Sequence, residues 1–227
     1  MILLGAVTNA AAVFVGGITG LLMKKGLPKR FGDSIMHALA LFTFGLGVAF
    51  FMKSQDIMVV IASLLLGTLI GEIIDIEKRL ESLGNSLQSK VKGVGGSFSE
   101  GFVTASLLFC VGSMAIMGSL QSGLSANHEV LYAKAVMDLV AALIFAAAMG
   151  LGVAMSAVPV LIYEGSLSLL ASVASPYLSN VVVDEMTAVG GVLLMGLALS
   201  ILEIKKIRVG NMIPGIFLPI IIISYRK

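Results

Sequence analysis

Charged residues are scarce in this sequence. Asp, Glu, Lys and Arg make up 12% of the 227 residues, whereas a typical soluble domain has about 25%. Hydrophobic residues make up 58% and form runs that a soluble protein could not shield, since its surface must meet water. The formal net charge is only +2 and the basic residues form short clusters, which excludes a nucleic-acid-binding surface. We therefore expect an integral membrane protein in contact with the lipid bilayer.

Cysteine and the common catalytic motifs are scarce or absent. The single cysteine, Cys110, excludes an intramolecular disulfide and a multi-thiolate metal site. The sequence has no HExxH motif and no clustered His and carboxylate residues, which argues against a metal-dependent intramembrane enzyme. It also lacks a GxxxxGK(S/T) phosphate-binding loop. We therefore expect no enzymatic activity, no metal site and no cofactor.

Long apolar runs account for most of the chain. A spanning helix needs about 20 mostly apolar residues, because the hydrocarbon core is about 30 Å thick and a helix rises about 1.5 Å per residue. Seven segments meet or approach this length, at 2–23, 35–52, 57–74, 101–120, 135–153, 157–175 and 186–204. An eighth segment, 212–225, is shorter and contains two prolines, so it either spans a thinned bilayer or forms a re-entrant hairpin. The sequence predicts an all-α polytopic membrane protein with seven or eight transmembrane segments.

The Lys and Arg residues between the spans predict the orientation, because cytoplasmic loops carry an excess of them. If the loop after the first span is inside, eleven basic residues are cytoplasmic and four are outside; the counts become thirteen and two if the eighth segment does not cross. Both counts place the N-terminus outside.

The longest polar stretch, 76–100, is then cytoplasmic. Ile76, Leu80, Leu83 and Leu87 recur at helical spacing while charged residues occupy the other faces, which is typical of an amphipathic helix lying in the interface plane. Two interpretations stay open for this segment: an inert connector, or a helix that docks a partner or gates the protein.

Three short matches, in the same order along the chain, suggest an internal repeat. Residues 5–8 match 101–104, residues 45–49 match 150–154, and residues 69–72 match 161–164. Because each unit has three spans, the second unit would be inverted relative to the first, as in many secondary transporters. We therefore divide the chain into a first three-helix repeat (1–75), a connector (76–100), a second, inverted repeat (101–175), and a C-terminal span with the short segment (176–227).

Few polar side chains lie at membrane depth, and these are the candidate solute-binding residues. They are Thr8, Asn9, Thr104, Ser106 and Glu164. The first four occupy comparable depths in the two repeats, so the first and fourth helices are expected to meet near mid-depth and to form one cavity; the alternative is that these groups join helices. Glu164 could bind a cation, carry a proton or be held by a hydrogen bond from a neighbouring helix.

Other polar and small residues have more structural interpretations. Lys134 and Asp138 are four residues apart and are expected to form an ion pair, with a possible gating role, where the fifth span enters from outside. Asp184 and Glu185 could attract cations to an outer vestibule or favour the start of a helix. The GxxxG pairs at 16–20 and 67–71 indicate close helix packing, within the chain or in a homo-oligomer.

Several blocks of residues, spread over the whole chain, carry a family resemblance. They are 109–119, which begins Phe-Cys-Val-Gly, and 5–9, 24–30, 134–138, 185–191 and 211–214. In these blocks the sequence resembles the YdfK/YqgA family of bacterial inner-membrane proteins, described as a domain of unknown function (DUF554). The resemblance implies a multi-pass protein of the bacterial cytoplasmic (inner) membrane. It carries no activity over, and the sequence departs from the family pattern at Ser113 and Glu164.

Two functions of different classes follow. The first is a small secondary transporter or channel that moves an ion or small polar solute through an inverted pair of three-helix units. The alternative is a non-transporting membrane partner or regulator that acts through its cytoplasmic amphipathic helix.

Overall fold

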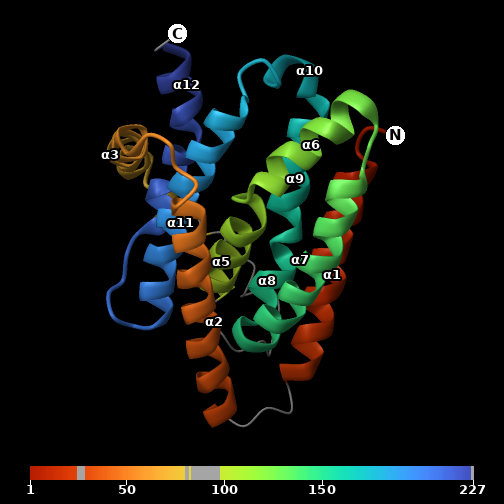
Figure 1. The fold of residues 1–227 in the computed structure, drawn as a ribbon. Coiled ribbons are helices and arrows are strands. Elements are labelled where there is room, and N and C mark those ends of the chain that lie inside the picture. Colours follow the sequence, from red (N-terminus) through yellow and green to blue (C-terminus); the bar gives the residue numbers. More distant parts are fainter. Residues whose placement is uncertain (25–28, 80–81, 83–97, 226–227) are drawn as a thin grey trace. The chain divides into compact units, whose positions relative to one another are not determined.

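The structure is a computed structural model that describes residues 1–24, 29–79, 82 and 98–225 (Figure 1). All the regular elements of these residues are helices. They are α1 (Leu4–Lys24), α2 (Lys29–Phe51), α3 (Ile57–Ile74), α5 (Phe98–Cys110), α6 (Ser113–Ser125), α7 (Glu129–Met149), α8 (Leu151–Met155), α9 (Ala157–Leu169), α10 (Ala171–Ala174), α11 (Asn180–Ile201), the 3-10 helix η1 (Val209–Phe217) and α12 (Leu218–Tyr225).

The described helices confirm a polytopic α-helical membrane protein, with fewer clear spans than the sequence predicts. Six helical stretches are long and apolar enough to cross a bilayer, and the bent pair of α5 and α6 would make a seventh. The bend between α5 and α6 is 59° and falls at Gly112, where glycine weakens a helix. The eighth predicted segment is a shorter apolar stretch, Val209–Tyr225, in which η1 contains Pro214.

The described chain divides into two compact units. Unit 1 consists of Met1–Met36, Glu81–Cys110 and Met114–Ala174. Within it, α1 packs along α7 and also contacts α8 and α9, while α5 contacts the same three helices. Figure 1 shows α1 and α7 side by side. Gly150, with φ of 93°, ends α7 and separates it from α8, so the helix following α7 is redirected within the unit.

Unit 2 consists of His37–Leu80, Val111–Ser113 and Ser175–Lys227. Here α3 packs against η1, and α11 contacts both of them. The start of α3 is capped by Asp56, whose carboxylate accepts the Met58 N–H at 3.0 Å. A short polar side chain at this position satisfies an amide that the first helical turn leaves without a partner.

The predicted repeat and connector have different outcomes. The repeat boundaries at 1–75 and 101–175 stay a prediction, and α1 lies in a different compact unit from α3. Most of the predicted amphipathic connector, 76–100, lies outside the described residues.

Candidate functional site

Four polar side chains from three helices meet in the interior of unit 1. They are Asn9 of α1, Lys134 and Asp138 of α7, and Glu164 of α9, with exposed fractions of 0%, 5%, 8% and 0%. We call these four residues the polar cluster. Each of the three stretches that supply them meets the length and composition of a membrane span. The cluster therefore places ionisable groups within membrane-spanning helices.

Hydrogen bonds and ion pairs join all four members of the polar cluster. The Asn9 amide nitrogen, Nδ2, donates to Asp138 Oδ2 at 3.0 Å and to Glu164 Oε1 at 2.8 Å. Lys134 pairs with Asp138, as the i,i+4 spacing predicts. Lys134 Nζ also lies 3.6 Å from Glu164 Oε1. The ammonium also lies 5.9 Å from the centre of the buried Phe109 ring, a favourable cation–π distance.

Glycines of α1 bring Asn9 to its partners on α7. A Cβ atom at Gly16 would collide with the backbone carbonyl of Leu139, and one at Gly20 with that of Leu143. Asn9, Gly16 and Gly20 lie on one face of α1 because they are seven and four residues apart. The backbone of α1 therefore lies directly against α7, and Asn9 on the same face reaches Asp138. The predicted close packing of this GxxxG pair occurs within the chain.

Two oxygen atoms of the polar cluster have no hydrogen-bond partner among the described residues. They are Asn9 Oδ1 and Glu164 Oε2, and both are buried. In each of the two side chains, one polar atom takes part in the Asn9–Glu164 hydrogen bond and the other is an acceptor for which the described residues supply no donor. Buried polar atoms in this state are uncommon and carry an energetic cost of about 1–3 kcal/mol each.

The structure brings together some of the predicted site residues and not others. Asn9 and Glu164 meet each other and the Lys134–Asp138 pair. Thr8, in contrast, donates its hydroxyl to Leu4 O in its own helix at 2.8 Å. The hydroxyls of Thr104 and Ser106 on α5 have no partner among the described residues.

The expected meeting of the first and fourth helices is corrected. α1 packs along α7 rather than along α5. The physical reason lies in the same glycines that suggested the contact: Gly5 lies against Leu131, and Gly101 against Met149, so each accommodates a side chain of α7. Helices α1 and α5 were expected to pack against each other, and each of them packs against α7 instead.

A second fully buried carboxylate, Glu185 of α11, lies in unit 2. Its Oε1 accepts the backbone N–H of Gln55 at 2.6 Å and of Asp56 at 2.8 Å, and its Oε2 accepts the Ser54 hydroxyl at 2.8 Å. The carboxylate therefore holds the segment that leads into α3, where the helix dipole also favours a negative charge. The sequence suggested that Glu185 attracts cations to an outer vestibule or favours the start of its own helix. It did not predict this contact with residues 54–56.

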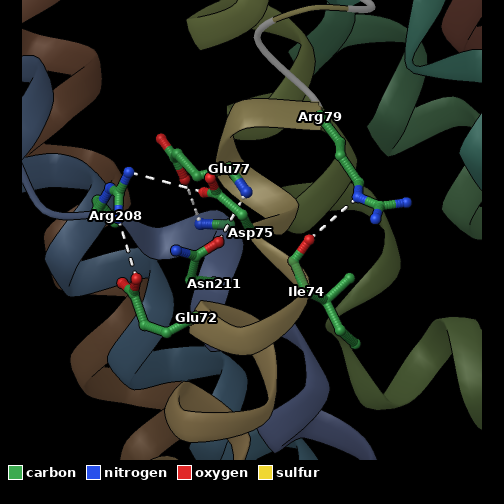
Figure 2. Close-up of polar contacts among 8 residues, drawn as sticks. Glu72, Ile74, Asp75, Glu77, Arg79, Arg208 and Asn211 are labelled. Carbon is green, nitrogen blue, oxygen red and sulfur yellow. Dashed lines mark hydrogen bonds and ion pairs between the residues drawn. The ribbon is translucent and has the colours of Figure 1, made fainter.

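Surface ion pairs lie at the C-terminal end of α3 (Figure 2). Arg208 lies 2.9 Å from Glu72 and 3.6 Å from Asp75. These side chains are 53%, 44% and 39% exposed, so the attraction between them is weakened by water.

Next to these pairs, Asn211 connects η1 to the residues that follow α3. Its Oδ1 accepts the Glu77 N–H at 2.7 Å, and the Glu77 carboxylate accepts the Gly210 N–H at 2.7 Å (Figure 2). Gly71 of α3 lies so close to the Asn211 backbone that a Cβ atom would collide with its carbonyl. This second GxxxG pair, like the first, packs within the chain.

Comparisons with known proteins agree over nearly the whole chain. The family described as "Protein of unknown function (DUF554)" matches residues 4–224. The uncharacterized membrane protein YdfK of Bacillus subtilis (strain 168) is 30% identical over 223 residues, which cover 96% of this chain and 95% of YdfK. The uncharacterized protein YqgA of Escherichia coli (strain K12) is 32% identical over 220 residues, covering 95% and 94%. No solved structure matches the chain.

Proposed function

The chain belongs to the DUF554 family, and we propose that it is a small secondary transporter or channel that moves an ion or small polar solute across the bacterial inner membrane. The observation that carries this proposal is the polar cluster of unit 1. Its members are buried in helices long enough to span a bilayer. Ionisable residues at such depth are rare, and they commonly mark the paths of ions, protons or substrates.

A purely structural role explains the polar cluster less well. Taking charged groups out of water costs several kcal/mol for each ion, and apolar side chains of similar volume often stabilise a core as well or better. The cluster also leaves two acceptors without a donor among the described residues, which a structural hydrogen-bond network normally avoids. A site that binds and releases a ligand accounts for both features.

A break between two helices beside the polar cluster supports the same proposal. Phe109, whose ring contacts Lys134, is the penultimate residue of α5, and the bend between α5 and α6 follows directly. In secondary transporters, interrupted helices commonly form the substrate and ion sites.

The proposed orientation has the N-terminus outside, as the basic residues indicate. It is tested with a cysteine at position 89 in a chain whose Cys110 has been replaced. We expect Ser89→Cys to resist an impermeant thiol reagent in intact cells and to react after the cells are opened. Labelling in intact cells would reverse the orientation.

Transport itself is tested with the purified full-length protein in liposomes. Charge movement on a solid-supported membrane is recorded for Na⁺, K⁺, NH₄⁺, H⁺ and a set of amino acids, and tracer exchange covers neutral movements. We expect at least one of these solutes to be transported, and Asn9→Ala to abolish its transport while yield and oligomer size stay unchanged. Transport that is equal in wild type and Asn9→Ala, or absent for every solute, would contradict the proposal.

Deletion of residues 80–92 separates this proposal from a regulator that acts through the predicted amphipathic helix. We expect solute movement in liposomes to survive the deletion, because the polar cluster lies on α1, α7 and α9. Loss of a co-purifying partner together with an absence of transport in the undeleted protein would favour the regulator.

A further inference from the structure

Asn9 and Glu164 are joined by one hydrogen bond, and each side chain has one further acceptor atom that no donor in the described part of the chain contacts. Asn9 Nδ2 donates to Glu164 Oε1 at 2.8 Å. Among the described residues, Asn9 Oδ1 and Glu164 Oε2 have no partner, and both side chains are fully buried. The atoms without a partner are therefore the second oxygens of the same two planar groups.

A primary amide and a protonated carboxylic acid have complementary edges. The amide presents an N–H donor beside a C=O acceptor, and the acid presents a C=O acceptor beside an O–H donor. When the carboxyl group is ionised it offers acceptors only, so it has no donor for Asn9 Oδ1. One proton on Oε2 would supply the missing donor, and a second hydrogen bond to Asn9 Oδ1 would then satisfy both atoms.

The other hydrogen bonds leave this edge of Asn9 available. Nδ2 carries two hydrogens, of which one is donated to Glu164 and the other to Asp138. Asp138 is the direct partner of Lys134, whereas the Lys134 ammonium lies 3.6 Å from Glu164. Lys134 is therefore mainly the counter-ion of Asp138, and its positive charge balances the negative charge of Glu164 only in part.

The charge balance of the polar cluster favours the same proton. Two carboxylates and one ammonium give a net charge of −1, which is costly within a membrane-spanning helix bundle. With a proton on Glu164, the cluster is neutral. The other ionisable groups close to Glu164 are Lys134 and Asp138 from α7, the Cys110 thiol from α5 and the adjacent Tyr163 hydroxyl of α9. Helix α1 contributes the neutral amide of Asn9, and α8 and α10 have no ionisable side chain.

We infer that Asn9 and Glu164 form a binding site for one proton, and that this proton is the ion coupled to transport. On uptake, a proton joins Glu164 Oε2 and is donated to Asn9 Oδ1. On release, the O–H bond breaks and the proton leaves, while the Lys134 ammonium, already within 3.6 Å, compensates the carboxylate. The coupling part of this inference rests on the proposed transport function, whereas the proton site does not.

Infrared difference spectroscopy on the reconstituted full-length protein tests the proton site directly. Spectra recorded across a pH change report the carbonyl stretch of a protonated carboxylic acid, which shifts in D₂O. We expect one buried acid to titrate in the wild type, its band to be lost in Glu164→Gln, and its frequency to move in Asn9→Ala because the Oδ1 acceptor is gone. Glu185→Gln is the matched control and should leave the band unchanged.

A labelled wild-type protein keeps the test decisive if Glu164→Gln does not fold. Uniform ¹³C labelling of glutamate alone should shift the titrating band, and labelling of aspartate alone should not. A band that follows aspartate, or the absence of any titrating glutamic acid band, would overturn the proton site.

Solute flux measured in the same liposomes tests the proton site and its coupling to transport separately. A pH gradient should drive solute movement in the wild type and not in Glu164→Gln. A titrating band without any flux would retain the proton site and contradict the transport function. Flux that is equal in the wild type and Glu164→Gln, and independent of pH, would retain transport and contradict the coupling.

Discussion

Glu164 in unit 1 and Glu185 in unit 2 are carboxylates of the same length and the same burial, and they differ in what surrounds them. Both side chains are fully buried in helices of spanning length. Glu185 accepts three hydrogen bonds, from two backbone amides and one hydroxyl, which use both of its oxygens. Glu164 accepts one, from Asn9, and shares Lys134 with Asp138.

The difference shows that burial alone does not identify a functional carboxylate. Three donors use both oxygens of Glu185 and fix its side chain to the segment before α3. The second oxygen of Glu164 meets no donor among the described residues. A proton or a bound cation at this oxygen would supply the missing interaction. The number and position of the donors, rather than depth, separate the structural carboxylate from the candidate functional one.

The largest effect on stability is expected when the structural carboxylate is removed. Glu185→Ala leaves two backbone amides and the Ser54 hydroxyl without their acceptor and opens a cavity. We expect the free energy of unfolding to fall by about 4 kcal/mol, measured by SDS-induced unfolding in detergent micelles and followed by circular dichroism. Glu203→Ala, at an exposed position, is the control. Wild-type stability in Glu185→Ala would remove the structural role.

The next largest effect is expected at the contact that positions Asn9. In Gly16→Ala the added methyl group collides with the Leu139 carbonyl, so α1 must move away from α7. We expect a loss of about 2–3 kcal/mol together with loss of transport, because Asn9 moves away from Asp138. Gly45→Ala is the matched control, since a Cβ atom there meets nothing within 4 Å. Equal behaviour of the two variants would show that the approach of α1 to α7 does not position the site.

The sequence predicted the helices and the contacts within one helix better than it predicted which helices contact each other. Hydropathy predicted the span at 57–74, which is α3, because an apolar run is a local property of the sequence. The spacing of Lys134 and Asp138 predicted their pair for the same local reason. The contact of Asn9 with Glu164 joins residues 155 positions apart, and no local pattern encodes it. One signal was available: Asn9 shares a helix face with the GxxxG pair, which indicates that it faces a closely packed helix.

The role of Glu185 was missed for a related reason. Its position near the start of the span suggested a group that attracts cations to an outer vestibule or favours the start of its own helix, whereas its three donors come from residues 54–56. The identity of a carboxylate's donors depends on which helix ends pack together, and the sequence of one helix does not contain that information. The same limit explains why α7, rather than α5, was found beside α1.

Conversion of each carboxylate to its amide sharpens the comparison. In Glu164→Gln, the new Nε2–H can donate to Asn9 Oδ1 while Oε1 still accepts from Nδ2, so we expect the free energy of unfolding to change by less than about 0.5 kcal/mol. In Glu185→Gln, only one of the two side-chain oxygens remains as an acceptor for the three donors, and we expect a loss of about 1–2 kcal/mol. The same unfolding assay measures both variants. A larger loss in Glu164→Gln than in Glu185→Gln would reverse the assignment of the two roles.

A small effect is also expected where charges are numerous but exposed. Arg208→Gln removes the ion pairs to Glu72 and Asp75 at the end of α3 (Figure 2), in which all three side chains are more than one third exposed. We expect a loss of about 0.5 kcal/mol in dilute buffer, which should shrink at 1 M salt because the screening length falls from about 10 Å at 0.1 M to about 3 Å. A loss that rivals that of Glu185→Ala, or that is insensitive to salt, would mean that the end of α3 is shielded from water in the membrane. Such a result would place Arg208 with the buried groups, where the number of partners decides how tightly a charge is held.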